Sequence, residues 1–159
     1  MTPKRSTLDW LMEAASLAAL ALIIGTVLVH WDQLPPQVPK HFGASGQPNG
    51  WGSRNTLLLL PAIAAGIYVL ATAATYFTRL VNLPIEIDRD SPDVQRVLTS
   101  FAIAMKLSCL LVFLYITGAT VRTAPGRSAG LGGAFLPVSL IATFSPTGYY
   151  LLRLRRYEK

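Results

Sequence analysis

Charged residues and cysteine are both scarce in this chain of 159 residues. Charged side chains make up 14% of the sequence, whereas 52% of its residues are hydrophobic. Soluble domains carry about 25% charged residues, so this balance excludes an ordinary soluble domain and favours a membrane protein. The one cysteine, Cys109, excludes an internal disulfide and a cysteine metal cluster. We expect Cys109 to be a packing residue in an apolar segment.

Motifs of catalysis and metal binding are also few. The sequence contains no Walker lysine motif and no H-E-x-x-H zinc motif. His30, Asp32 and His41 are acceptable zinc ligands by type, but their spacing matches no known metal motif. Ser45 and Ser53 share a loop with His41, a set that a loop of this composition contains by chance. We therefore predict that the protein is not an enzyme and needs neither a cofactor nor a metal.

Four apolar segments are long enough to cross a bilayer, for which about 20 residues suffice. They cover residues 8–30, 55–77, 97–121 and 130–152. A soluble helical bundle would need polar helix faces, and the second segment holds no charged residue. The predicted fold class is therefore all-α, an integral membrane bundle of four transmembrane helices. Glycine and proline weaken the fourth segment, which is either a kinked span or a shorter helix ending near Ser145, followed by an interfacial piece.

The placement of lysine and arginine predicts the orientation. If the N-terminus is cytoplasmic, nine basic residues lie on the cytoplasmic side and four on the other. We therefore expect a multi-pass protein of the cell membrane with both termini in the cytoplasm. The formal net charge of +6 then reflects topology and attraction to anionic membrane lipids. No basic stripe interleaved with aromatic residues predicts nucleic-acid binding.

A polar, turn-rich segment, residues 34–54, separates the first two apolar segments. Its prolines and glycines restrict the backbone to specific shapes, and Asn49-Gly50 is typical of a tight turn. We expect a structured extracytoplasmic loop over residues 31–54 that carries the function. Its aromatic residues are expected at the membrane boundary, either as an aromatic belt or as residues that capture a peptide or lipid. These residues are Trp31, Phe42 and Trp51.

The loop also carries a family pattern. The elements Leu34-Pro35, Val38-Pro39, His41-Phe42, Gly46 and Asn49-Gly50-Trp51-Gly52-Ser53 stand in order along it. They resemble the extracytoplasmic signature of domain of unknown function 1648, a membrane module at the N-terminus of SdpI-like immunity proteins. The resemblance implies a module over residues 1–80, with two transmembrane helices and the loop. Residues 81–159 are then a second helix pair with a basic tail, in which we match no motif.

We expect the loop to bind or sense a ligand. The candidate ligand-binding residues are Pro39, His41, Phe42, Asn49 and Trp51. The SdpI-like resemblance implies toxin immunity or signal transduction, with a peptide toxin or another membrane protein as partner. The sequence leaves homo-oligomerisation open.

Lys106 is an unusual residue because it lies about nine positions into the third apolar segment. An ammonium there costs several kcal/mol unless it is paired or hydrated. Glu13 lies a few residues inside the first segment from the same membrane side, which predicts an intramembrane charge pair of Glu13 and Lys106. Lys106 could instead snorkel to the interface or take part in transport. Two alternative functions stay open: a small transporter or channel subunit that uses Lys106, and a non-catalytic subunit of a larger membrane complex.

Overall fold

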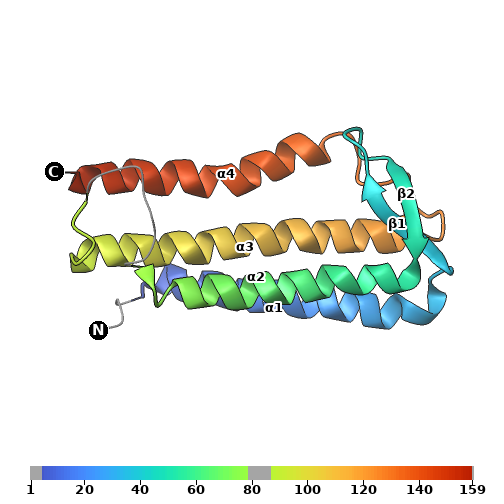
Figure 1. Cartoon of the computed structure of the whole chain (residues 1–159), viewed down its shortest axis with the longest axis horizontal. Coiled ribbons are helices and arrows are strands. Elements are labelled where there is room, and N and C mark those ends of the chain that lie inside the picture. The colour runs from blue at the N-terminus through green and yellow to red at the C-terminus, as the bar shows by residue number, and fades with distance from the viewer. Residues whose placement is uncertain (1–4, 79–86, 159) are drawn as a thin grey trace.

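The computed structural model describes residues 5–78 and 87–158, in which four long helices run side by side (Figure 1). These helices are α1 (Thr7–His30), α2 (Leu59–Ala74), α3 (Pro92–Thr123) and α4 (Phe135–Leu154). With the short helical turns that adjoin three of them, all four are long and apolar enough to cross a membrane. The chain is a multi-pass, all-α membrane bundle, which confirms the predicted fold class. The predicted boundary between residues 80 and 81 lies outside the described residues.

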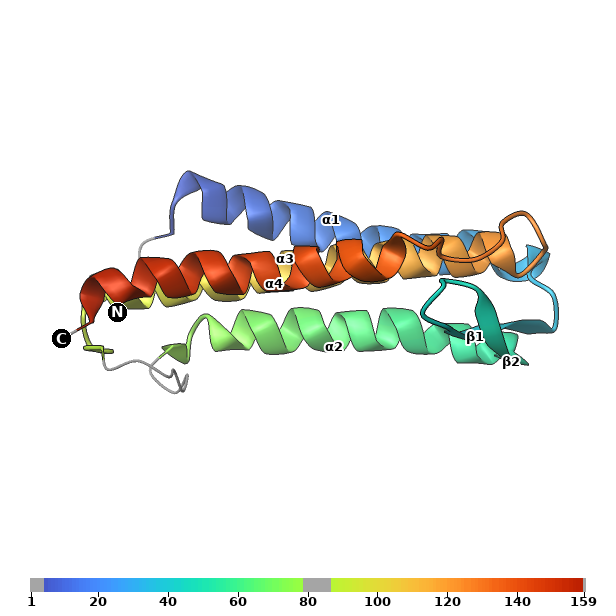
Figure 2. The same ribbon diagram turned by 90° about the horizontal axis from the view of Figure 1, so that it is seen from above.

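α3 is the central helix of the bundle. α1 and α2 lie beside each other along α3, and α4 packs on the opposite side of α3 (Figures 1 and 2). A buried apolar cluster joins the first three helices at mid-length, where Ala19 and Ala64 allow close approach to Leu110. A second buried cluster joins α4 to α3 near the chain termini, and in it the ring centroids of Phe101 and Tyr150 lie 5.8 Å apart.

The fourth helix corrects two sequence-based predictions. It begins at Phe135, five residues later than expected, because Gly130 and Gly132 adopt φ values of 132° and 84° that no α-helix allows. It also continues past Ser145, so the shorter alternative ending near that residue is wrong. Pro146 lies inside α4 and cannot donate to the carbonyl of Ala142, four residues earlier.

A side chain of the neighbouring helix satisfies that carbonyl. The Ser108 hydroxyl of α3 donates a hydrogen bond of 2.7 Å to the carbonyl oxygen of Ala142. Hydrocarbon supplies no water to replace a lost backbone hydrogen bond, so an intramembrane proline needs such a donor. Ser108 therefore lets α4 run unbroken through Pro146.

The loop between α1 and α2 is a β-hairpin at the end of the bundle opposite both chain termini (Figure 1). Strands β1 (Gln37–Phe42) and β2 (Pro48–Ser53) pair antiparallel, and short 3-10 helices, η1 (Trp31–Gln33) and η2 (Arg54–Leu58), flank them. We call this end of the bundle the hairpin end. A structured loop was expected, and its regular structure is a two-stranded sheet.

The predicted turn at Asn49-Gly50 is wrong. Both residues lie in β2, and Gly50 pairs with His41 at an irregularity in the strand register. The chain turns at residues 43–47 instead, where the amide of Gly43 donates to the carbonyl of Gln47 at 2.9 Å. Gly46 supplies the required positive φ, 78°, whereas the φ of Gly50 is not positive. The expected turn dipeptide was overridden by a register that buries Val38 of β1.

A third apolar cluster seats the hairpin on the helices. Fully buried Val38 of β1 packs with Leu34 and Leu57 from the two ends of the loop, and with Val27 of α1 and Val121 of α3. The cluster therefore joins the hairpin to α1 and α3. It gives the hairpin a fixed position, because a lone two-stranded hairpin is at best marginally stable in water.

Candidate functional site

The five candidate ligand-binding residues all lie on the paired strands of the hairpin. Pro39 and Trp51 are cross-strand partners, and Phe42 pairs with Pro48. His41 Nδ1 lies 2.5 Å from Asn49 Oδ1. Since an amide oxygen only accepts, Nδ1 is the donor in this pair as the two side chains are placed, and Nε2 is left for a further hydrogen bond.

The five candidate residues differ in how far their side chains are exposed to an incoming molecule. Pro39 is buried and Phe42 is half-buried, so both position the strand. His41, Asn49 and Trp51 are exposed, and 45% of Trp51 is accessible. An imidazole, an amide and an indole are therefore available on the hairpin to an incoming molecule.

The base of the hairpin is closed by a cation-π contact. The guanidinium carbon of Arg54 lies 5.1 Å from the centroid of the Trp31 ring, and Arg54 Nη1 donates to the Trp31 carbonyl at 3.5 Å. These two residues begin η2 and η1, so the contact joins the two ends of the loop. Trp31 also packs against the apolar cluster under the hairpin, and this placement assigns it a structural role.

The tip of the hairpin contacts the connection between α3 and α4. The amide of Leu131 donates a 2.7 Å hydrogen bond to the carbonyl of Gly46. A Cβ at Gly46 would overlap the backbone of Gly132, and a Cβ at Gly130 would overlap the carbonyl of Gly46. We call this the hairpin–loop contact. Sequence reasoning missed it, because nothing local in the chain links glycines more than 80 positions apart.

The structure brings Glu13 and Lys106 together inside the bundle. Lys106 Nζ lies 2.5 Å from Glu13 Oε2, donates to Thr72 Oγ1 at 2.9 Å, and sits 4.6 Å from the centroid of the Tyr68 ring. Lys106 is 1% exposed. The snorkelling alternative is wrong, because the ammonium is directed to these groups on α1 and α2.

A second cation shares the Glu13 carboxylate. Arg5 Nη1 lies 3.3 Å from Glu13 Oε1, and Arg5 Nη2 donates to Thr75 Oγ1 at 3.1 Å. Thr75 in turn donates to the carbonyl of Thr72 at 2.7 Å. The resulting polar network holds two cations and one carboxylate, and it joins α1, α2 and α3.

The two histidines that we weighed as zinc ligands make other contacts. His30 Nδ1 lies 2.9 Å from the carbonyl of Thr26 in its own helix, and His41 bonds Asn49. Within residues 5–78 and 87–158, no three His, Cys, Asp or Glu side chains gather in a group that could hold a metal ion. Cys109 is half-buried in α3.

One motif escaped the sequence analysis. Residues 126–130 read Gly-Arg-Ser-Ala-Gly, the letters of the G-x-S-x-G nucleophile elbow. An elbow stands between a strand and a helix, whereas this segment follows the helix α3. Ser128 Oγ donates to the carbonyl of Gly130 at 3.2 Å, which stabilises the loop. We assign Ser128 no catalytic role.

Comparison with known proteins assigns part of the chain to a family. Residues 17–65, from within α1 through the hairpin into α2, match the family model described as Domain of unknown function (DUF1648). This segment belongs to the DUF1648 family. All five candidate residues of the hairpin stand in elements of that family's pattern, and all five lie in the matched segment.

A curated relative is also similar to the chain. It is an "Uncharacterized protein" of Archaeoglobus fulgidus that is 40% identical over 77 residues, covering 43% of this chain and 42% of the archaeal protein. The match therefore spans less than half the length of that relative. No solved structure matches the chain. Glu13 and Lys106 both lie outside the DUF1648 segment.

The hairpin–loop contact predicts unequal costs for two glycine substitutions. Gly46 and Gly126 have φ values of 78° and 77°, but no atom lies within 4 Å of a Cβ built at Gly126. Both alanine variants should lose about 1 kcal/mol of unfolding free energy from left-handed backbone strain. Gly46→Ala should lose more, because its Cβ also displaces the backbone of Gly132. Thermal unfolding in detergent measures both, and equal losses would show that the contact adds nothing to stability.

The polar network predicts that substitutions of Glu13 and Lys106 lower the unfolding free energy by unequal and non-additive amounts. Lys106→Met leaves Glu13 with Arg5, whereas Glu13→Gln leaves buried Lys106 and half-buried Arg5 without an anion. Glu13→Gln should therefore cost more unfolding free energy, on the order of 3 kcal/mol, and Lys106→Met less. In the double variant, part of the Glu13→Gln cost should be recovered. Denaturation in mixed micelles tests this, and strictly additive losses would contradict the pair.

Proposed function

We propose that this DUF1648-containing membrane protein binds a ligand at the exposed hairpin residues His41, Asn49 and Trp51, as a sensor or immunity protein without catalysis. The observation that carries the proposal is that these side chains are exposed on a hairpin held in one position. The apolar cluster at its base and the hairpin–loop contact at its tip both fix it. Pre-organised side chains lose little entropy on binding, so a fixed hairpin suits recognition.

The chemistry of the hairpin favours a peptide as the ligand. An indole provides apolar contact area with few rotatable bonds, the amide of Asn49 keeps its two N–H donors, and the imidazole of His41 keeps Nε2 for a further hydrogen bond. An unpaired peptide backbone offers matching donors and acceptors. This agrees with the resemblance to SdpI-like immunity proteins, in which a secreted peptide toxin would be the ligand and signal transduction the consequence.

The transporter alternative receives less support from the site around Lys106. The ammonium bonds Glu13 and Thr72 and lies over Tyr68, so its interactions bind helices together. A carrier residue would need a path to water. We therefore assign Lys106 to the fold and the hairpin to function.

The proposed orientation places the hairpin outside the cell and both termini in the cytoplasm. Both termini lie at one end of the bundle and the hairpin at the other (Figure 1), as an even number of spans requires. The bias of nine basic residues to four then selects the cytoplasmic end.

Cysteine labelling tests this orientation in a Cys109→Ala background. An impermeant maleimide should label Ser45→Cys, in the exposed hairpin turn, on intact cells. Asp93→Cys, exposed at the start of α3, should react only after permeabilisation. The opposite pattern would invert the topology, and labelling of both variants on intact cells would remove a span.

Site-specific photocrosslinking tests ligand binding. A benzophenone amino acid at Trp51 should form a discrete adduct in native membranes, because Trp51 faces the proposed ligand. The same probe at exposed Gln37, which pairs with Ser53 at the base of the hairpin, should form it in lower yield. Asn49→Ala should lower the yield at position 51, whereas Ser53→Ala should not. Adducts of equal yield at positions 51 and 37, or a yield insensitive to Asn49→Ala at normal protein abundance, would contradict the proposal.

A further inference from the structure

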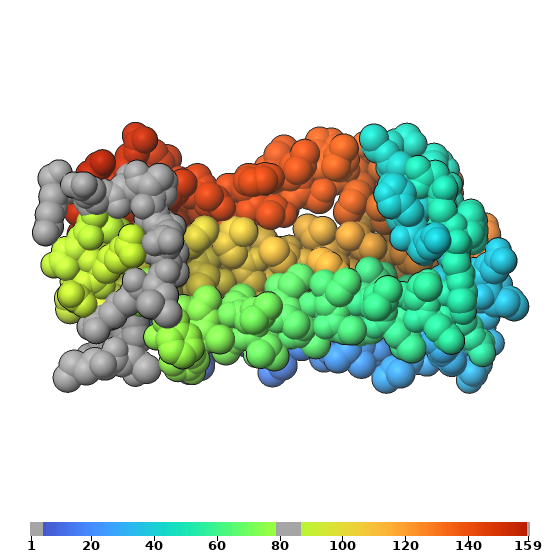
Figure 3. Space-filling view, in the orientation of Figure 1, coloured from blue at the N-terminus to red at the C-terminus, as the bar shows by residue number. Residues whose placement is uncertain are grey.

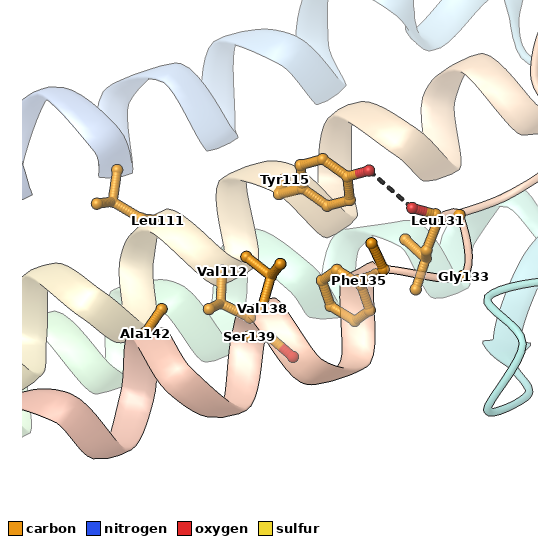
Figure 4. A pocket seen from close by; sticks show the side chains of 11 residues that line it. Leu111, Val112, Tyr115, Leu131, Gly133, Phe135, Val138, Ser139 and Ala142 are labelled. Carbon is orange, nitrogen blue, oxygen red and sulfur yellow. Dashed lines mark hydrogen bonds between the residues drawn. The ribbon is translucent and has the colours of Figure 1, made fainter.

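An apolar groove of about 490 Å³ lies between α3 and α4 in the half of the bundle nearer the hairpin (Figure 4). Its principal lining residues are Leu111, Val112, Tyr115, Leu131, Phe135 and Val138. Figure 3 shows the surface hollowed between these two helices. The volume lies within the range of about 300–1,000 Å³ that is usual for small-molecule sites.

The groove exists because α4 is attached to α3 unevenly. Near the chain termini, the buried cluster around Tyr150 and Leu154 holds the two helices together. Toward the hairpin, the rings of Tyr115 and Phe135 stack with centroids 5.4 Å apart, and Tyr115 Oη donates to the carbonyl of Leu131 at 2.7 Å. These contacts brace one end of the groove, and residues 132–134 carry little or no side chain to fill it.

The groove opens sideways into the space that lipid occupies. Leu111 and Val138 line it and are 51% and 61% exposed. Both belong to helices long and apolar enough to span the membrane. A molecule in the groove is therefore in contact with hydrocarbon and can enter from the bilayer.

A basic residue, Arg122, lies in the last turn of α3, nearer the hairpin end than the groove residues of that helix. Arg122 follows Leu111 and Tyr115 on one face of α3, at helical spacings of four and seven residues. Its Nη1 lies 3.9 Å from a Cβ built at Gly118, so the guanidinium lies beside Gly118, one turn back along the helix. Arg122 is exposed, and no carboxylate among the described residues forms an ion pair with it.

We propose that this groove binds one acyl chain of an anionic phospholipid, with the lipid phosphate at Arg122. The apolar walls match the chain, and the unpaired guanidinium matches the phosphate, which it can bind through two parallel hydrogen bonds. A helix of a second copy fits less well. Such a helix is about 10 Å wide and would need a continuous face, whereas the groove occupies only the hairpin half of the helix pair.

Native mass spectrometry of the delipidated full-length protein in micelles tests this proposal. The probes are phosphatidylglycerol and phosphatidylcholine with identical acyl chains. The wild type should bind one phosphatidylglycerol in preference to phosphatidylcholine. Arg122→Gln should lower the affinity for phosphatidylglycerol roughly fivefold and leave that for phosphatidylcholine nearly unchanged. The matched control is Arg127→Gln, because Arg127 lies at the same end of the bundle but beside His30, outside the groove.

A second pair of variants tests the site of the acyl chain. Ala142→Phe fills the inner end of the groove and should weaken binding of both lipids. Ile141→Phe places the same ring on the adjacent, lipid-facing position and should not. Thermal unfolding of each variant verifies folding. Equal effects of Arg122→Gln and Arg127→Gln, unchanged binding by Ala142→Phe, or a protein dimer in place of the bound lipid would each overturn the proposal.

Discussion

The Lys106 ammonium is the strongest constraint on this bundle, because it lies in the middle of an apolar helix and must find an anion without water. Glu13 of α1 supplies that anion, and Thr72 of α2 supplies a further acceptor. The first three helices are therefore joined by a polar contact of defined geometry, in addition to apolar packing. Apolar packing alone discriminates weakly between helix faces in a bilayer, since lipid is as apolar as the side chains.

This constraint reaches the hairpin through the chain connection. β1 follows α1 and β2 precedes α2, so the two helices that the polar network joins at one end carry the hairpin at the other. The apolar cluster around Val38 fixes the same helices against α3 at the hairpin end. The spacing of α1 and α2 is thus set at both ends, and the strand register between them follows from that spacing together with the burial of Val38.

Sequence reasoning predicted the parts of the fold that depend on local composition. The four apolar segments, the Glu13–Lys106 pair and the structured loop followed from hydropathy, charge and turn chemistry. The turn at Asn49-Gly50 failed because a nearby Gly46 could serve as well, and only the burial of Val38 chooses between the two registers. Hydropathy also carries no information on backbone angles. It therefore did not indicate that Gly130 and Gly132 adopt a positive φ, which moves the start of α4 to a later residue.

The residues of the candidate site could be predicted from the sequence, but the contacts between them could not. The family pattern located His41, Asn49 and Trp51, yet only the strand register shows that His41 bonds Asn49 and that Pro39 is buried. Contacts between distant segments left no trace in composition. Ser108 compensates for Pro146 from another helix, 34 residues from the carbonyl that it bonds.

The hairpin–loop contact makes the two halves of the chain mechanically dependent on each other. Leu131 donates its amide to Gly46 at the tip of the hairpin, and the same residue lines the groove between α3 and α4. Its carbonyl also accepts the hydroxyl of Tyr115, which forms the opposite wall. Leu131 therefore connects the hairpin tip directly to a wall of the groove. If a ligand on the hairpin shifts Leu131 and so changes the free energy of binding in the groove, a molecule in the groove must change the free energy of binding at the hairpin by the same amount. This follows because linkage between two binding equilibria is reciprocal.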